Sequence, residues 1–150
     1  MLLFKILGLL ILLFCSIIIG FLKSEQLVLR KNKLNSFCKG FSILKERIRC
    51  GEGEIKTLIL KSFEENLFYQ RDGIIKVNKE HLQNYEITLI EEYLNIAGMS
   101  DPNSEFEKCK MYNHLLNEQY KKAEAECSSL CKLYKTMGVL GGIFICIFFL

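Results

Sequence analysis

The chain has 150 residues, which favours a single domain, and it carries a net charge of only +3. A charge this small, without an arginine-rich stripe or an aromatic platform, argues against a nucleic-acid-binding protein. Half of the residues are hydrophobic, and much of this material lies in residues 1–22 and 137–150. The charged middle segment, residues 23–136, is long enough for one modest core.

Residues 1–22 form the first apolar segment. Leu2–Leu22 contains one charged residue, Lys5, and as a helix it would extend about 30 Å, the thickness of the hydrocarbon core of a bilayer. A cleaved signal peptide is the competing interpretation, but the apolar run is long for one and no A-x-A-like cleavage motif follows it. The segment therefore predicts an N-terminal transmembrane helix.

Residues 137–150 form the second apolar segment, which contains no charged residue. Its length as a helix is about 21 Å, short for a span, although Lys132 and Lys135 can extend their amines back to the headgroups. A re-entrant or interfacial segment and a buried core helix are the alternatives. We expect a C-terminal transmembrane helix here.

Three glycines stand at the start of this second segment. Gly138 and Gly142 are four residues apart, with Gly141 beside them, and small residues at this spacing allow close helix packing in membranes. The alternative is that glycine is simply common in transmembrane helices. We expect the first apolar helix to be the packing partner.

Basic residues flank the inner end of each apolar segment. They are Lys23, Arg30, Lys31 and Lys33 after the first segment, and Lys132 and Lys135 before the second. The N-terminal side offers only Lys5 and the α-amine. Since positively charged flanks stay in the cytoplasm, this pattern predicts a cytoplasmic middle domain with both termini outside.

Helical periodicity dominates residues 23–136. Apolar residues recur at steps of three and four from Leu27 to Ile48, with Arg30 as the polar exception, and Gly51-Glu52-Gly53 then ends the helix. The same pattern predicts helices over residues 54–68 and 79–97, separated by a turn at residues 70–78 around Asp72-Gly73. The predicted inward side chains of these two helices are Ile55, Leu58, Ile59, Phe63 and Leu67, then Leu82, Tyr85, Leu89, Tyr93 and Ile96.

A fourth helix follows Gly98, with Asp101 as its N-cap and Pro102 as its first residue. Its seam keeps steps of three and four from Phe106 to Met137, typical of a coiled-coil-like helix pair, with Asn113 as the polar member. The seam residues are Phe106, Cys109, Asn113, Leu116, Tyr120, Ala123, Cys127, Leu130, Tyr134 and Met137. The predicted fold is all-α: an antiparallel, four-helix bundle-like domain flanked by two transmembrane helices.

No motif for catalysis, metal binding or cofactor binding stands out. His81 and His114 are isolated and are expected on the surfaces of charged helices, and no phosphate-binding or nucleophile-elbow motif occurs. Five cysteines lie between the apolar ends, and an odd number without paired spacing indicates a reducing compartment. Cys127 and Cys131 are four residues apart, but Cys127 lies on the apolar seam and is expected to be a small core residue. We expect a protein that is not an enzyme and binds no cofactor or metal.

Certain segments resemble the stage III sporulation protein AB family of endospore-forming bacteria. The strongest is residues 132–142, KLYKTMGVLGG, which leads into an apolar end, as the K-x-Y-x-x-x-G-x-L-G-G segment does in that family. Residues 94–101, LNIAGMSD, stand where the family carries an L-G-x-x-D turn between helices. The N-terminal span followed by a basic, leucine-spaced helix is a weaker match. Gly51-Glu-Gly-Glu-Ile55 replaces the family's T-P-L-x-E/D turn, and the central aromatic residue, often tryptophan, is missing.

The resemblance implies a non-enzymatic subunit of the channel complex between mother cell and forespore. The family's soluble domain is similar to the cytoplasmic domains of type II secretion and type IV pilus platform proteins. By that analogy the chain would lie in the mother-cell membrane around the forespore and couple a cytoplasmic secretion-type ATPase to other membrane subunits of the channel. The alternatives are a membrane-anchored redox sensor using Cys127 and Cys131, and an exported helical scaffold whose first segment is cleaved.

Overall fold

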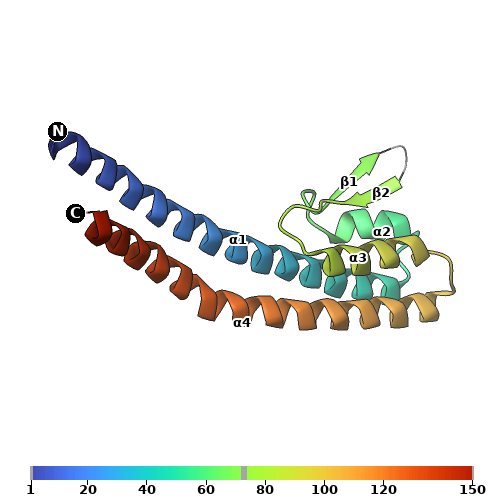
Figure 1. Ribbon diagram of the computed structural model, residues 1–150. Coiled ribbons are helices and arrows are strands. Elements are labelled where there is room, and N and C mark those ends of the chain that lie inside the picture. Colours follow the sequence, from blue (N-terminus) through green and yellow to red (C-terminus); the bar gives the residue numbers. More distant parts are fainter. Residues whose placement is uncertain (1, 72–73, 150) are drawn as a thin grey trace. The chain divides into compact units, whose positions relative to one another are not determined.

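The long helix α1, Leu2–Cys50, is the first of four helices in the computed structural model, which describes residues 2–71 and 74–149. The other elements are α2 (Ile55–Ser62), β1 (Phe68–Arg71), β2 (Ile74–Val77), α3 (Asn84–Ile96) and α4 (Pro102–Phe149) (Figure 1). The predicted all-α class is confirmed, with one short antiparallel hairpin added to it. The predicted four-helix bundle-like arrangement and the two membrane spans stay predictions.

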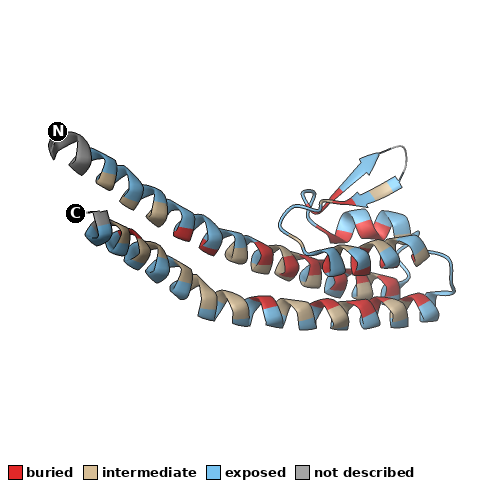
Figure 2. Ribbon diagram, viewed as in Figure 1, coloured by how far each residue is buried: buried red, intermediate tan, exposed pale blue. Residues whose placement is uncertain are grey.

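The chain forms two units, Met1–Leu29 with Ala123–Leu150, and Arg30–Lys122. In the first unit, which we call the helix pair, the N-terminal part of α1 and the C-terminal part of α4 run antiparallel. Leu13 lies near Gly142, Gly20 near Gly138, and Ser24 near Cys131. Many large apolar side chains of the helix pair are exposed (Figure 2). An exterior of this composition suits a hydrocarbon environment better than water.

The second unit, which we call the domain, has its own core. The expected seam of α1 is confirmed there, because Leu34, Phe37, Phe41, Leu44 and Ile48 are all buried. Aromatic rings from several elements meet in edge or tilted contacts around this seam: Phe37, Phe41, Phe63, Phe68, Tyr93 and Tyr112. Such contacts add specific geometry to the apolar burial.

The end of α1 and the start of α4 follow the sequence signals. α1 stops at Cys50, and Gly51 and Gly53 then adopt positive φ angles of 68° and 126°, a conformation that glycine adopts at little cost. α4 begins at Pro102, and the Ser104 N–H donates to Asp101 Oδ2 at 3.1 Å. The predictions of a glycine stop and of an Asp-Pro start are confirmed.

The connection between α2 and α3 differs from the prediction. The expected helix over residues 54–68 ends at Ser62, and the expected turn at residues 70–78 is largely a hairpin of β1 and β2. Phe68 pairs with Val77, and both are buried. Alternating β-branched and aromatic residues favour strands when one face of the hairpin packs against a hydrophobic core. Asp72-Gly73, the expected centre of the turn, lies outside the described residues.

α3 also starts later than expected, at Asn84 rather than residue 79. Leu89 and Tyr93 are buried as predicted, whereas Tyr85 is exposed and Glu86 is buried in its place. His81 precedes the helix, in a turn with a φ of 59°, so its expected position on a helix is wrong. The helix starts at a capping box in which Gln83 and Glu86 bond reciprocally. This local motif sets the first residue of α3, although the helical apolar pattern begins further upstream.

Candidate functional site

The backbones of the helix pair approach each other closely at Gly20 and Gly138. A Cβ atom built on Gly20 would lie 3.1 Å from Gly138 Cα and 2.7 Å from the Tyr134 carbonyl oxygen. The Ser16 hydroxyl donates to the Gly138 carbonyl at 2.8 Å. Small residues therefore allow the two backbones to approach closely enough for the Ser16 side chain to bond to the Gly138 carbonyl. Small residues and side-chain hydrogen bonds of this kind are typical of helix association in membranes.

The other two glycines singled out from the sequence lie along the same seam. A Cβ on Gly142 would contact Leu13 at 3.4 Å, and one on Gly141 would lie 3.6 Å from Ser16 Oγ. Neither position forbids a side chain as firmly as Gly138 does. Gly20 completes the close contact and was not predicted, because a single glycine in an apolar helix carries no spacing signal.

The basic residues divide between the two units. In the helix pair, Lys23 and Lys132 are exposed, and the Lys135 amine lies 5.3 Å from the centroid of the Phe21 ring, within cation–π range. In the domain, Lys31 and Lys33 are half-buried, and Lys33 Nζ donates to the Glu80 carbonyl at 2.8 Å. Burial lowers the pKa of Lys33, and Glu80 partly offsets that effect.

Arg30 does not belong to an exposed flank. Its side chain is 9% exposed, and Nε and an Nη atom both donate to Glu86 Oε1, at 3.0 and 2.7 Å. The Glu86 side chain is fully buried, and its Oε2 accepts the Gln83 N–H at 2.8 Å. The polar exception in the α1 seam is thus half of a buried ion pair that ties α1 to the start of α3. Glu86 was not predicted from the sequence, although the capping-box spacing from Gln83 was its signal.

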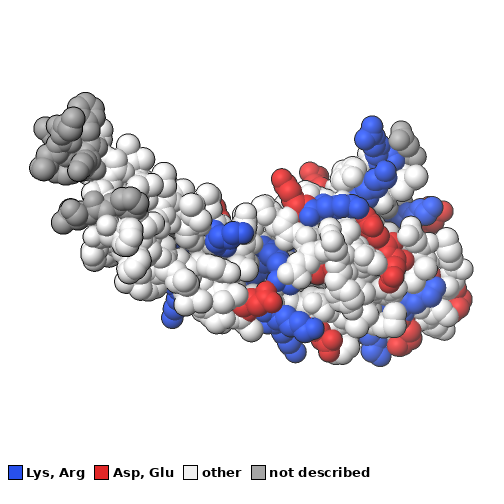
Figure 3. Space-filling model, in the orientation of Figure 1, with Lys and Arg blue, Asp and Glu red and all other residues white. Residues whose placement is uncertain are grey.

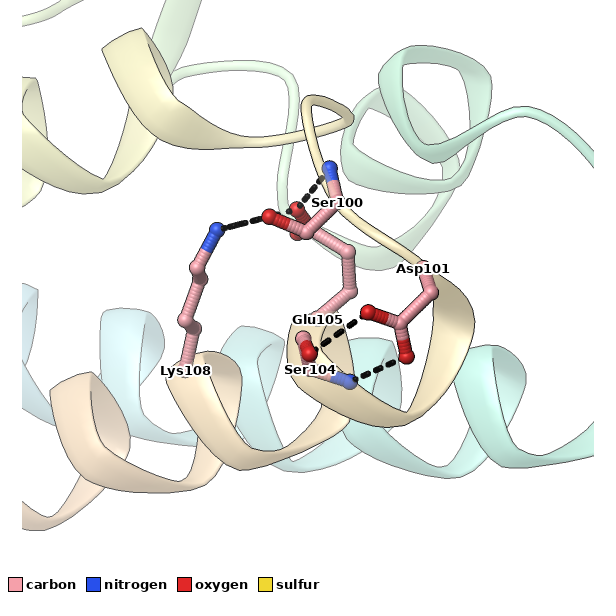
Figure 4. Close-up of polar contacts among 5 residues, drawn as sticks. All are labelled: Ser100, Asp101, Ser104, Glu105 and Lys108. Carbon is pink, nitrogen blue, oxygen red and sulfur yellow. Dashed lines mark hydrogen bonds and ion pairs between the residues drawn. The ribbon is translucent and has the colours of Figure 1, made fainter.

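A second polar network surrounds the first turn of α4 (Figure 4). Glu105 is buried, and its Oε1 accepts the Ser100 N–H at 3.2 Å and the Lys108 ammonium at 3.4 Å. Lys108 also donates to the Ser100 hydroxyl. Asp101 accepts from both the amide and the hydroxyl of Ser104, and these bonds lower the pKa of its carboxyl. The network holds the turn before α4 against the helix and has the character of a cap.

The two thiols of Cys127 and Cys131 lie close together on α4, with 3.3 Å between their sulfur atoms. The Cys131 thiol also lies 3.5 Å from the Ser24 carbonyl on α1. In the domain, Cys109 is fully buried, and burial raises the pKa of its thiol to about 11. A thiol with so high a pKa is a poor nucleophile near neutral pH.

The histidines do not assemble a site in the described part of the chain. His114 is exposed on α4, 3.7 Å from Glu118, and His81 is exposed in its turn. Among the described residues, no group of three or more His, Cys, Asp or Glu side chains is arranged to hold a metal ion.

Membrane-spanning capacity within the described residues rests on α1. Its apolar portion has a mean hydropathy of 2.4 over 18 residues and is largely exposed, so the helix is long and apolar enough to cross a bilayer. A signal sequence near an N-terminus has the same properties. The second span and the orientation of the domain stay predictions.

Comparison with known proteins identifies the family. The family model described as stage III sporulation protein AB matches residues 70–150, more than half of the chain. No curated protein and no solved structure matches. The matched region contains the glycine-bearing apolar end and the LNIAGMSD turn on which the sequence resemblance rests. The chain therefore belongs to the stage III sporulation protein AB family, which implies a role in sporulation.

Proposed function

We propose that the protein is a non-enzymatic membrane adaptor of the sporulation channel complex between mother cell and forespore. In this role it couples a cytoplasmic secretion-type ATPase to the membrane subunits of the channel. The observation that carries the proposal is the combination of the family match with the two-unit architecture, an apolar helix pair and a charged domain with its own core. The proposed location is the mother-cell membrane around the forespore, with the domain in the cytoplasm.

The basic residues support this orientation. Lys23, Lys132 and Lys135 follow or precede the apolar parts of the helix pair, where the positive-inside bias places the cytoplasm. The Lys135 amine on the Phe21 ring is a suitable position for a lysine at the level of the headgroups. By analogy with secretion platform proteins, the domain would then be accessible to a cytoplasmic ATPase.

The native Cys50 offers a direct test of the orientation. This thiol is exposed at the end of α1, whereas Cys109 is buried. Intact non-sporulating cells that express the chain in the cell membrane, where an external reagent reaches one face, would be treated with a membrane-impermeant maleimide. The modification of Cys50 would be quantified by peptide mass spectrometry, with Cys50→Ser as the control. Protection in intact cells and labelling after lysis are expected. Labelling in intact cells would place the domain outside and remove any role with a cytoplasmic ATPase.

Partner binding is tested separately. The full chain, solubilised in mild detergent, would be co-purified with the secretion-type ATPase of the sporulation complex, and the tagged partner alone would serve as the control. Stable co-elution is expected. Absence of co-elution, with a folded chain by circular dichroism, would count against the adaptor role.

The thiol pair on α4 is the observation behind a second candidate function, a redox sensor. The 3.3 Å between the Cys127 and Cys131 sulfurs is short, but residues four apart on a helix keep their Cβ atoms roughly 5–6 Å apart. A disulfide needs a Cβ separation of about 3.5–4.5 Å, so oxidation would distort α4. We expect the double variant Cys127→Ser and Cys131→Ser to sporulate normally; a sporulation defect would favour the sensor.

The exported scaffold is the remaining alternative. It requires cleavage after the first apolar segment, so the N-terminus of the purified protein would begin near Lys23. Intact-mass measurement of the protein from sporulating cells distinguishes the two forms.

A further inference from the structure

The outward face of the β hairpin carries an unusual set of side chains. Because the strands pair Tyr69 with Lys76 and Arg71 with Ile74, these four residues share the face opposite the buried pair Phe68 and Val77. Tyr69 is 48% exposed and Ile74 is 60% exposed. We call these four residues the hairpin face. It combines two cations with two large apolar side chains that are only partly covered.

A groove borders the hairpin face. One hollow of about 340 Å³ lies between the hairpin and α3, and a second of about 260 Å³ reaches α2 and the turn after α3. Ile74, Ile75, Leu94 and Asn95 line both hollows, so the two hollows adjoin as one groove in which apolar and polar side chains are mixed. Its size is suitable for a few side chains of a bound segment.

The charges at this groove are unbalanced. Lys76 and Lys56 line the groove, and Arg71 lies beside it on the hairpin face. None of these three forms an ion pair with any described residue. Glu91 lines the groove, but it is paired with Lys79 at 2.8 Å. Lys and Arg side chains gather over the hairpin (Figure 3). Among the described residues, the groove therefore presents a net positive charge beside the apolar side chains of Ile74, Ile75 and Leu94.

Protection of strand edges does not account for this composition. Charged side chains on a short hairpin discourage pairing with other chains, and Arg71 and Lys76 alone would serve that purpose. An exposed isoleucine and tyrosine on the same face work against it, because exposed apolar surface beside an edge strand favours association.

We propose that the hairpin face and its groove bind an acidic peptide segment of another protein. Apolar side chains of that segment would occupy the groove against Ile74 and Leu94, and its carboxylates would pair with Arg71 and Lys76. The inference rests on the proposed function in one respect, that an adaptor needs a docking surface on its domain. The test does not use the ATPase, so the two proposals can fail separately.

The test uses the full chain in nanodiscs of zwitterionic lipid and two fluorescent peptides of about twelve residues. One peptide alternates Glu and Leu, and the other alternates Lys and Leu. Fluorescence anisotropy is expected to show binding of the acidic peptide at least roughly tenfold tighter than of the basic one, and the affinity should fall with salt. Empty nanodiscs report binding to lipid.

Matched variants locate the site. The double variant Arg71→Glu and Lys76→Glu is expected to weaken binding of the acidic peptide by roughly tenfold or more. The control, Lys39→Glu with Lys122→Glu, makes the same charge change at exposed helical positions of the domain and should bind like the native chain. Ile74→Ser tests the apolar contribution and is expected to weaken binding severalfold without any change in charge.

Three outcomes would overturn the proposal. The first is equal loss in the hairpin and control variants, which would show an effect of net charge alone. The second is equal binding of both peptides. The third is hairpin-dependent binding to nanodiscs of anionic lipid without binding of the acidic peptide, which would make this surface a membrane contact. Circular dichroism of each variant verifies the fold. If the charge reversals unfold the domain, Ile74→Ser becomes the deciding variant, and unchanged binding of the acidic peptide by it would overturn the proposal.

Discussion

The buried pair of Arg30 and Glu86 gives the sharpest test of how the domain is held together. Arg30→Met keeps most of the side-chain volume but removes both guanidinium donors from the fully buried Glu86 carboxylate. The neutral Gln83 N–H on Oε2 remains. Removing one partner of a buried ion pair costs about 3–5 kcal/mol. With a urea m-value of about 2 kcal/mol/M for a domain of this size, the unfolding midpoint should fall by roughly 1.5–2.5 M.

The double variant Arg30→Met with Glu86→Gln separates charge from packing. The glutamine side chain can still accept the Gln83 N–H, which the carboxylate accepts at 2.8 Å, but no charge is buried. Replacing both charges of a buried pair is often nearly neutral, so this variant should recover most of the lost stability. Lys110→Met breaks an exposed pair with Glu107 and serves as the control, with an expected change below about 1 kcal/mol.

Urea titration of the full chain in detergent micelles, followed by circular dichroism at a helical band, measures these differences. Two results would refute the reasoning: a cost below about 1 kcal/mol for Arg30→Met, or a double variant no more stable than the single one. Either would show that water or another group satisfies Glu86 without Arg30.

Three further predictions concern packing and thiol chemistry. Gly40→Ala would place a Cβ atom closer to the Phe63 ring than van der Waals contact allows. We expect a loss of about 1–3 kcal/mol in the same urea assay, and an unchanged midpoint would contradict the packing. Gly138→Val would force the two helices of the helix pair apart and should lower the thermal unfolding midpoint in micelles. The control is Gly8→Val, which should leave the midpoint unchanged because no atom lies within 4 Å of a Cβ built there. Equal effects of the two variants would argue against the close contact. Burial raises the pKa of the Cys109 thiol from about 9 to about 11, so at pH 8 its thiolate fraction is about a hundredfold below that of an ordinary thiol. Cys109 should therefore react with iodoacetamide far more slowly than the exposed Cys50, and its reaction rate should keep rising up to about pH 11. Mass spectrometry measures the modification, and rapid modification of Cys109 at pH 8 would show that the domain opens.

Local features were predictable because their causes lie within a few residues. The α1 seam from Leu34 to Ile48 follows from apolar spacing, and the ends at Gly51 and Pro102 follow from backbone preferences. The hairpin was missed because its strands, Phe68–Arg71 and Ile74–Val77, are only four residues long. Segments this short carry too little periodicity to be assigned as strands beside the turn signal at Asp72-Gly73.

The sequence likewise predicted only part of the candidate site in the helix pair. The spacing of Gly138, Gly141 and Gly142 indicated a packing surface, but only the fold places Gly20 against Gly138 and the Ser16 hydroxyl on its carbonyl. The glycines of a helix show where a close approach is allowed. They do not show which residue approaches.

The sequence by itself determined the two apolar segments, the helical class, the end of α1, the start of α4 and the family resemblance, because each depends on composition or on neighbours a few positions apart. The tertiary structure alone decided that Arg30 faces inward to Glu86, 56 residues away, and that Tyr69 and Ile74 share an exposed face with Arg71 and Lys76. An arginine beside an apolar segment has the same local signature whether it contacts a headgroup or a buried carboxylate. The difference arises only when the start of α3 packs against α1 and removes both charges from water.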